Sequence, residues 1–77
     1  MADRLAVLVG QVFDVDPAKV TDADNPDTLP EWTSMGHVNL IVALEQEFDI
    51  KISPNEAEDM LSVKLVRDLL REKGARL

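Results

Sequence analysis

The chain has 77 residues, no cysteine and a formal net charge of −7. We expect residues 1–77 to form a single domain, which at this size buries only about 60% of the surface that its unfolded chain exposes. The composition excludes a disulfide framework and a thiolate metal site, and the negative charge disfavours binding of nucleic acid or anionic lipid.

The first predicted element is an amphipathic helix that begins at Ala2 or Asp3 and ends at Phe13. Its apolar residues recur at helical spacing: Leu5, Leu8, Val9, Val12 and Phe13. Gly10 costs this helix about 1 kcal/mol relative to alanine. Pro17 follows soon after and ends the regular pattern.

A long polar connection, rich in Asp, Asn and Pro, follows from Asp16 to Glu31. We expect Val15 and Val20 to tuck its start under the bundle. Its acidic residues are spaced like the start of an EF-hand calcium loop: Asp22, Asp24 and Asp27. Pro26, however, stands where an oxygen ligand is expected, and Thr33 replaces the bidentate glutamate. We therefore interpret the segment as a solvated loop without a metal site.

The second predicted helix begins at Ser34 and ends at Phe48. Thr33 can cap its first turn with the side-chain hydroxyl, which leaves the Ser34 oxygen pointing outward at the first helical position. A helix N-terminus also favours phosphate. The other serines, Ser53 and Ser62, are better explained as helix caps.

Apolar side chains of the second helix fall on two stripes at helical spacing. The stripe that we expect to pack on the domain comprises His37, Leu40, Ile41, Leu44 and Phe48. The other stripe starts beside the serine and comprises Met35, Val38 and Val42. A second apolar stripe usually needs a second contact, so we expect it to bind a partner.

A short third helix is predicted after a loop at residues 49–52. Ile50 and Ile52 alternate with polar residues there, but no second strand exists to pair with them. Ser53, Pro54 and Glu56 then supply a capping serine, a proline at the first helical position and the glutamate of a capping box. We expect the helix to run to about Leu61. Its inward-facing side chains are predicted to be Ala57, Met60 and Leu61.

The last predicted helix is capped by Ser62 and stopped by Gly74. Its apolar residues keep the helical period: Val63, Val66, Leu69 and Leu70. The order of elements predicts an all-α fold, a small four-helix bundle of three longer helices and one short helix, with a long loop between the first two. A three-helix bundle with a frayed third element is the alternative.

Several segments resemble the acyl carrier protein family. Thr33–Met35 stands where that family has its Asp-Ser-Leu attachment motif, and Ala43–Asp49 is similar to the Ala-Leu-Glu-Glu-Glu-Phe segment that follows it. Glu56–Glu58 and Ser62–Val63 are similar to the family too. The resemblance extends from Leu5 to Leu70 and so covers nearly the whole chain.

This resemblance implies that Ser34 carries a covalent 4′-phosphopantetheine arm, donated from coenzyme A by a separate phosphopantetheinyl transferase with magnesium. The arm would hold acyl groups as thioesters and present them to acyl-activating, acyl-transfer or synthase enzymes in fatty-acid, lipid or related acyl biosynthesis. We expect no catalytic residue. The predicted docking surface or acyl-pocket lip comprises Met35, Val38, Asn39, Val42, Glu45 and Glu47.

The residues around the serine depart from the family's pattern. Thr33 replaces the usual aspartate, which in the family helps the transferase to hold its metal and substrate. Gly36 and His37 replace an acidic and a small polar residue, and Asn39 removes a negative charge. Together with Trp32, these departures indicate a specialised carrier rather than one serving bulk fatty-acid synthesis.

Trp32 and His37 each have a structural and a functional interpretation. We interpret Trp32, the only tryptophan, as an anchor that holds the long loop on the bundle, and contact with the arm or a partner enzyme is the alternative. His37 lies on the packing stripe and has no second histidine or thiol with which to share a metal. A hydrogen-bonded structural role is therefore favoured over a catalytic one.

Three other functions are alternatives to the acyl carrier. An aminoacyl or peptidyl carrier would use the same arm, and an unmodified carrier-like docking module would fit Thr33. A hydrolase that uses Ser34 and His37 is poorly supported, because the serine lacks a strand-to-helix elbow and a small bundle offers little cleft.

The charge distribution favours partners with basic docking patches. Residues 1–61 carry thirteen acidic and three basic residues, whereas residues 62–77 carry two acidic and five basic ones. The chain begins without a signal-peptide pattern and has no apolar stretch long enough to span a bilayer. We therefore expect a cytoplasmic monomer without membrane insertion.

Overall fold

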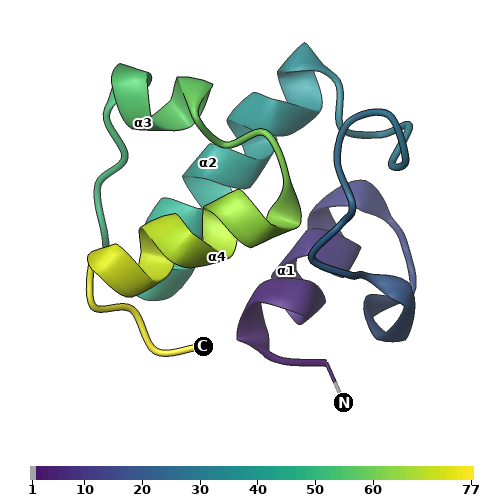
Figure 1. Cartoon of the computed structure of the whole chain (residues 1–77), viewed down its shortest axis with the longest axis horizontal. Helices are drawn as coiled ribbons and strands as arrows, with labels where there is room; N and C mark the ends of the chain where they lie inside the picture. Colours follow the sequence, from purple (N-terminus) through teal and green to yellow (C-terminus); the bar gives the residue numbers. More distant parts are fainter. Residues whose placement is uncertain (1) are drawn as a thin grey trace.

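The computed structural model describes residues 2–77 (Figure 1). The elements in chain order are α1 (Arg4–Phe13), the 3₁₀ helix η1 (Pro17–Lys19), α2 (Ser34–Phe48), α3 (Pro54–Glu58) and α4 (Val63–Glu72). The described part of the chain contains no strand, so the predicted all-α four-helix fold is confirmed. No helix within it has the length and apolar character needed to cross a membrane.

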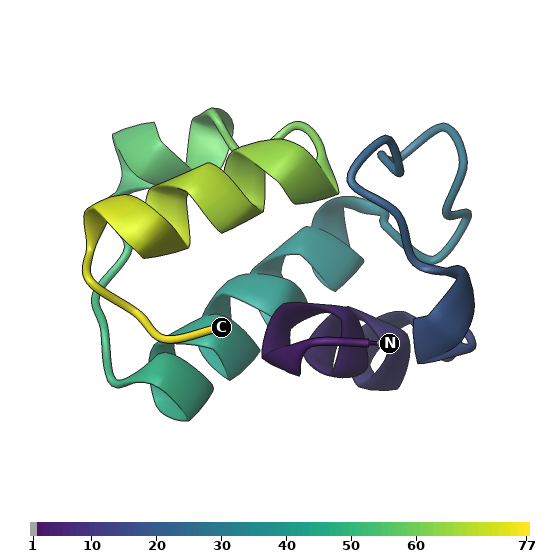
Figure 2. The same ribbon diagram turned by 60° about the horizontal axis from the view of Figure 1, so that its bottom comes forward.

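The helices enclose one hydrophobic core. In the view of Figure 2, α4 lies above α1 and α2, and α3 lies behind α4. The side chains that are less than 2% exposed come from α1, α2, α4 and the turn before α4: Leu5, Val9, Phe13, Leu40, Leu44, Met60, Val63, Val66 and Leu70. The start of α1 is joined to the C-terminal segment, because the Arg4 guanidinium donates to the Arg76 carbonyl at 2.8 Å.

The two predicted capping serines are both used. The Ser53 hydroxyl accepts from the Glu56 amide at 3.2 Å, and the Glu56 carboxylate accepts from the Ser53 amide at 2.9 Å, which completes the capping box. The Ser62 hydroxyl accepts from the Leu65 amide at 3.2 Å. Both hydroxyls therefore stabilise helix starts.

Gly10 is required by a close contact that the sequence analysis did not foresee. A Cβ atom at this position would lie 2.7 Å from the Val15 carbonyl oxygen and 2.8 Å from Cγ of Pro17. The missing side chain thus lets the chain fold back onto α1 directly after the helix. Val15 and Val20 pack partly buried against the core, as predicted.

The third helix is formed but stops short of Leu61, where the prediction placed its end. Beyond it the backbone turns too tightly for a helix, since the Met60 amide donates to the Ala57 carbonyl and the Leu61 amide donates to the Asp59 carbonyl. Met60 is 1% exposed, as predicted. Leu61, however, is 64% exposed, so the prediction that it faces inward is wrong.

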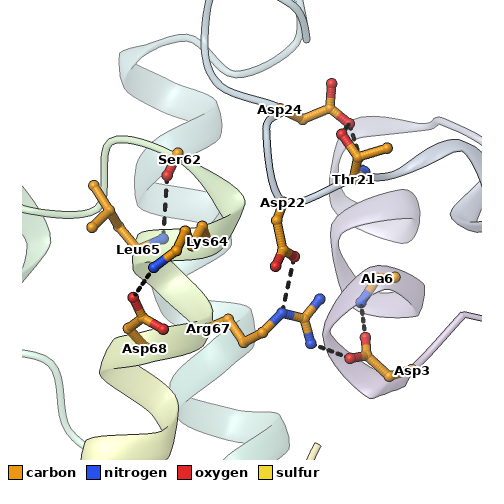
Figure 3. A network of polar contacts seen from close by, with 10 residues as sticks. All are labelled: Asp3, Ala6, Thr21, Asp22, Asp24, Ser62, Lys64, Leu65, Arg67 and Asp68. Carbon is orange, nitrogen blue, oxygen red and sulfur yellow. Dashed lines mark hydrogen bonds and ion pairs between the residues drawn. The ribbon is translucent and has the colours of Figure 1, made fainter.

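Arg67 of α4 joins three parts of the chain (Figure 3). Its guanidinium forms ion pairs with Asp3, the N-cap of α1, and at 3.0 Å with Asp22 of the long loop. The carbonyls of Asp22 and Asp24 accept hydrogen bonds from the first two amides of α4, at 3.1 and 2.9 Å. These contacts hold the long loop between α1 and α4.

Asp3 and Asp24 have lowered pKa values. Burial alone would raise the pKa of Asp3, but a backbone amide of α1 and the ion pair with Arg67 outweigh burial and lower it. The amide of Thr21 lowers the pKa of Asp24, and hydroxyl groups of Thr28 and Thr21 add to this effect against burial. Both groups are therefore held ionised in the folded protein.

These shifts predict an acid-sensitive fold. Because the pKa values are lower in the folded than in the unfolded state, their stabilisation is present above the unfolded pKa of about 3.9 and is lost as the pH falls through the folded pKa. Asp3→Asn keeps the N-cap. We expect this variant to lower the free energy of unfolding by less than about 1 kcal/mol at neutral pH. Urea unfolding at a series of pH values should show that its free energy of unfolding falls less in acid than that of the wild type.

Asp27→Asn is the matched control, since the Asp27 side chain is exposed and makes no hydrogen bond or ion pair within residues 2–77. It should leave the acid loss of stability as in the wild type. If Asp3→Asn loses stability in acid as steeply as the control, Asp3 does not contribute as described.

Candidate functional site

The predicted start of α2 is confirmed. Thr33 is the N-cap, and its hydroxyl accepts from the Gly36 amide at 3.1 Å. Ser34 is the first helical residue and is exposed, and its hydroxyl makes no hydrogen bond within the described residues. Of the serines, Ser34 alone is left free for chemistry, since the other two cap helices.

Gly36 is required by the loop that precedes the helix. A Cβ atom on Gly36 would lie only 2.2 Å from the Glu31 carbonyl oxygen and 3.2 Å from a ring carbon of Phe13. From the sequence alone, Gly36 is only a departure from the family's pattern. A tertiary contact explains it, because the loop crosses directly over the first turn of α2.

Trp32 is the anchor that the sequence analysis predicted. Its side chain is 4% exposed and stacks on Phe13 of α1, with 5.4 Å between the ring centroids. The nitrogen edge of its indole faces His37, whose ring centroid lies 6.2 Å away in a nearly parallel plane. Aromatic contacts at these separations are favourable, so Trp32 holds the residues before Ser34 against the core.

His37 has partners for both ring nitrogens. The Trp32 indole N–H donates to Nδ1 at 2.9 Å, so Nδ1 carries no proton. Nε2 lies 2.8 Å from the Ala57 carbonyl oxygen and must be the protonated nitrogen that donates to it. The imidazole is thus neutral and connects α2 to α3, which is the structural role predicted for it. Neither nitrogen is free to act as a base toward Ser34.

A pocket opens beside Ser34, between the start of α2 and the end of α3. Its volume is about 420 Å³, and its wall is mainly apolar. It is lined by Pro26, Trp32, Thr33, Ser34, His37, Ala57, Glu58, Met60 and Leu61. The predicted motif neighbours Trp32, Thr33 and His37 thus share one recess with the serine, whereas Met35 lies outside it.

The second apolar stripe of α2 is exposed. Met35 is 73% exposed, Val38 57% and Val42 47%, while Leu40 and Leu44 of the packing stripe are fully buried. Asn39 is exposed as well. Leu61 adds a further exposed apolar side chain beside the pocket, which the sequence analysis had assigned to the core.

The two glutamates predicted to flank this stripe have partners within the chain. Glu45 accepts from the Ile52 amide at 2.9 Å and so holds the extended loop before α3. Glu47 forms an ion pair with Arg4 of α1 at 3.3 Å. Each carboxylate thus already has an amide or cationic partner within the chain. The part of these glutamates in docking stays a prediction.

The acidic residues of the long loop do not converge on a common point. Asp22 pairs with Arg67, and Asp24 accepts from Thr21 and Thr28. Within residues 2–77 no cluster of three or more His, Asp or Glu side chains is arranged to hold a metal ion. Asp24 instead shapes the loop through local hydrogen bonds, and Asp22 holds the loop to α4.

The relatives found by comparison with known proteins share one description. No family model matches the chain. It is 34% identical over 70 residues to "Acyl carrier protein 2, mitochondrial" of Arabidopsis thaliana, an alignment that covers 91% of this chain and 56% of that protein. It is also 36% identical over 73 residues to an acyl carrier protein of Buchnera aphidicola, with 94% of this chain and 90% of that protein covered.

A third relative, an acyl carrier protein of Thermosynechococcus vestitus, is 35% identical over 74 residues, which are 95% of this chain and 90% of that protein. The chain thus spans nearly the full length of the bacterial relatives and about half of the mitochondrial one. The resemblance found in the sequence motifs is confirmed over nearly the whole chain, and the chain belongs to the acyl carrier protein family.

Proposed function

We propose that this chain is an acyl carrier whose Ser34 bears a 4′-phosphopantetheine arm. The observation that carries the proposal is the exposed Ser34 hydroxyl at the first position of α2, next to a pocket and without any capping role. The membership of the acyl carrier protein family supports carriage rather than catalysis. Ser34 is therefore the expected attachment site.

The site fits such an arm chemically. The first-turn amides and the dipole of α2 favour the negative charge of a phosphodiester on the Ser34 oxygen. The pocket walls, including Trp32 and Met60, offer apolar surface to a flexible chain. When bound, the arm supplies the thiol that holds an acyl group as a thioester. The chain itself orients the attachment point, since Thr33 fixes the first turn of the helix.

The partners in this proposal are a phosphopantetheinyl transferase with coenzyme A and magnesium, and acyl-activating, acyl-transfer or synthase enzymes. The net charge of −7 supports partners with basic docking patches, because opposite charges speed association. A cytoplasmic location and a monomeric state belong to the proposal and stay predictions.

The first prediction is that a transferase adds the arm to Ser34. After expression with a panel of transferases, intact-protein mass spectrometry should show the mass of one phosphopantetheine group. Ser34→Ala should abolish the addition, whereas Ser53→Ala and Ser62→Ala should keep it and lose about 1 kcal/mol of stability as caps. If no transferase modifies the wild type, the chain is instead an unmodified docking module, the alternative that Thr33 would fit.

The second prediction concerns Thr33. A carboxylate beside the serine can help a transferase to organise magnesium, so Thr33→Asp should speed modification by a general transferase. Aspartate caps helices about as well as threonine, and the free energy of unfolding should change by less than about 1 kcal/mol. Thr33→Asn is the matched uncharged control. An equal rate in all three proteins would place transferase selection elsewhere in the motif.

The third prediction tests the exposed stripe as the docking surface. Leu44 is fully buried, so Leu44→Ala should cost about 2 to 5 kcal/mol of stability. Val42 is 47% exposed, and Val42→Ala should cost well under about 2 kcal/mol while slowing partner turnover. Chemical denaturation beside a partner assay separates the effects. Equal destabilisation by both variants would mean that the stripes are not distinct.

A further inference from the structure

The pocket beside Ser34 is a shallow recess. Its volume of about 420 Å³ lies near the lower end of the range of about 300–1,000 Å³ for ligand pockets. Its wall includes Trp32 and Met60, which are 4% and 1% exposed, whereas Leu61 at its edge is 64% exposed. The recess thus ends on side chains that belong to the core.

Between this recess and the core lies a continuous arrangement of side chains, which we call the Trp–His bridge. It runs from Phe13 through Trp32 and His37 to the carbonyl of Ala57. One hydrogen bond of 2.9 Å connects Trp32, in the loop, to His37 of α2. The other, of 2.8 Å, connects His37 to Ala57 of α3. Because Trp32 and His37 both line the recess and Trp32 also belongs to the core, the bridge forms part of the wall between the recess and the interior.

Breaking the bridge would leave buried polar groups without partners. The Trp32 indole N–H and the two ring nitrogens of His37 are satisfied only by these contacts and by each other. Within residues 2–77 no buried side-chain nitrogen or oxygen lacks a partner. A hydrocarbon chain that separated these groups could not replace their hydrogen bonds, so its entry would be opposed.

We propose that Trp32 and His37 determine the cargo size of this carrier, and that it shelters short acyl groups. The recess has room for the end of the arm and a short acyl chain, while the bridge closes the core to a longer one. This inference rests on the proposed attachment at Ser34. The two residues act by closing a space and take no part in any chemical step.

Shielding of the thioester measures whether the acyl chain enters the interior. Each methylene that leaves water favours the buried state about fourfold, so an admitted chain would be shielded more strongly as it lengthens. The wild type is loaded from butyryl-, octanoyl- and dodecanoyl-coenzyme A, and the cleavage of each thioester by hydroxylamine is followed by mass spectrometry. Each rate is divided by the rate for the same thioester on urea-unfolded protein.

We expect the normalised rate of the wild type to be lowest for the butyryl thioester, which the recess shelters, and to rise toward one for the dodecanoyl thioester. Rates equal to one for all three thioesters would show that the recess shelters no acyl group. His37→Ala removes both hydrogen bonds, and its dodecanoyl thioester should be cleaved at least about tenfold more slowly than its butyryl thioester. His37→Gln, which keeps a donor and an acceptor, should behave as the wild type. If His37→Ala fails to fold by circular dichroism, Trp32→Phe replaces it, since phenylalanine keeps the ring but lacks the indole N–H.

The outcomes separate this inference from the proposed function. Failure of Ser34 to gain mass would overturn the proposed function before any cleavage is measured. Successful loading with shielding that rises with chain length in the wild type would overturn the cargo inference alone. A bridge variant whose dodecanoyl thioester is cleaved no more slowly than its butyryl thioester would show that Trp32 and His37 do not close the interior. Repeating the assay at a lower protein concentration excludes shielding by self-association.

Discussion

The stacking of Trp32 on Phe13, completed by the hydrogen bonds of His37, is the interaction on which the site depends. It brings the end of a long polar loop down onto α1 and fixes where α2 begins. Gly36 is needed because that loop then passes directly over the first turn of the helix. Thr33 caps the helix in this arrangement, and Ser34 takes the exposed first helical position.

A single helix serves both the fold and the proposed function because its two stripes have different neighbours. Leu40 and Leu44 are fully buried, whereas Met35 and Val38 are exposed beside the serine.

Some acidic side chains already have hydrogen-bond or ion-pair partners within the chain. Glu45, Glu47 and Asp3 are engaged with amides or cations of the same chain, so charge steering must depend on the overall field more than on these carboxylates.

The parts of the fold that depend on local sequence were predictable. Helical periodicity and the capping residues Thr33, Ser53 and Ser62 located the helix starts, because each acts within one turn of its own helix. Contacts between distant segments were not predictable. The clash that forbids a side chain at Gly10 or Gly36, the two ion pairs of Arg67 and the outward turn at Leu61 all depend on how separate elements meet. The bonding partners of His37 belong to this second group, although its structural role was foreseen.

The most direct test of the account is the state of the Trp32–His37 pair in solution, measured by nitrogen-15 NMR on the wild type. We predict a neutral His37 imidazole with the proton on Nε2, together with a Trp32 indole N–H that exchanges slowly with water because it donates to Nδ1. An indole N–H that exchanges as fast as that of an exposed tryptophan, or a His37 tautomer with the proton on Nδ1, would contradict it.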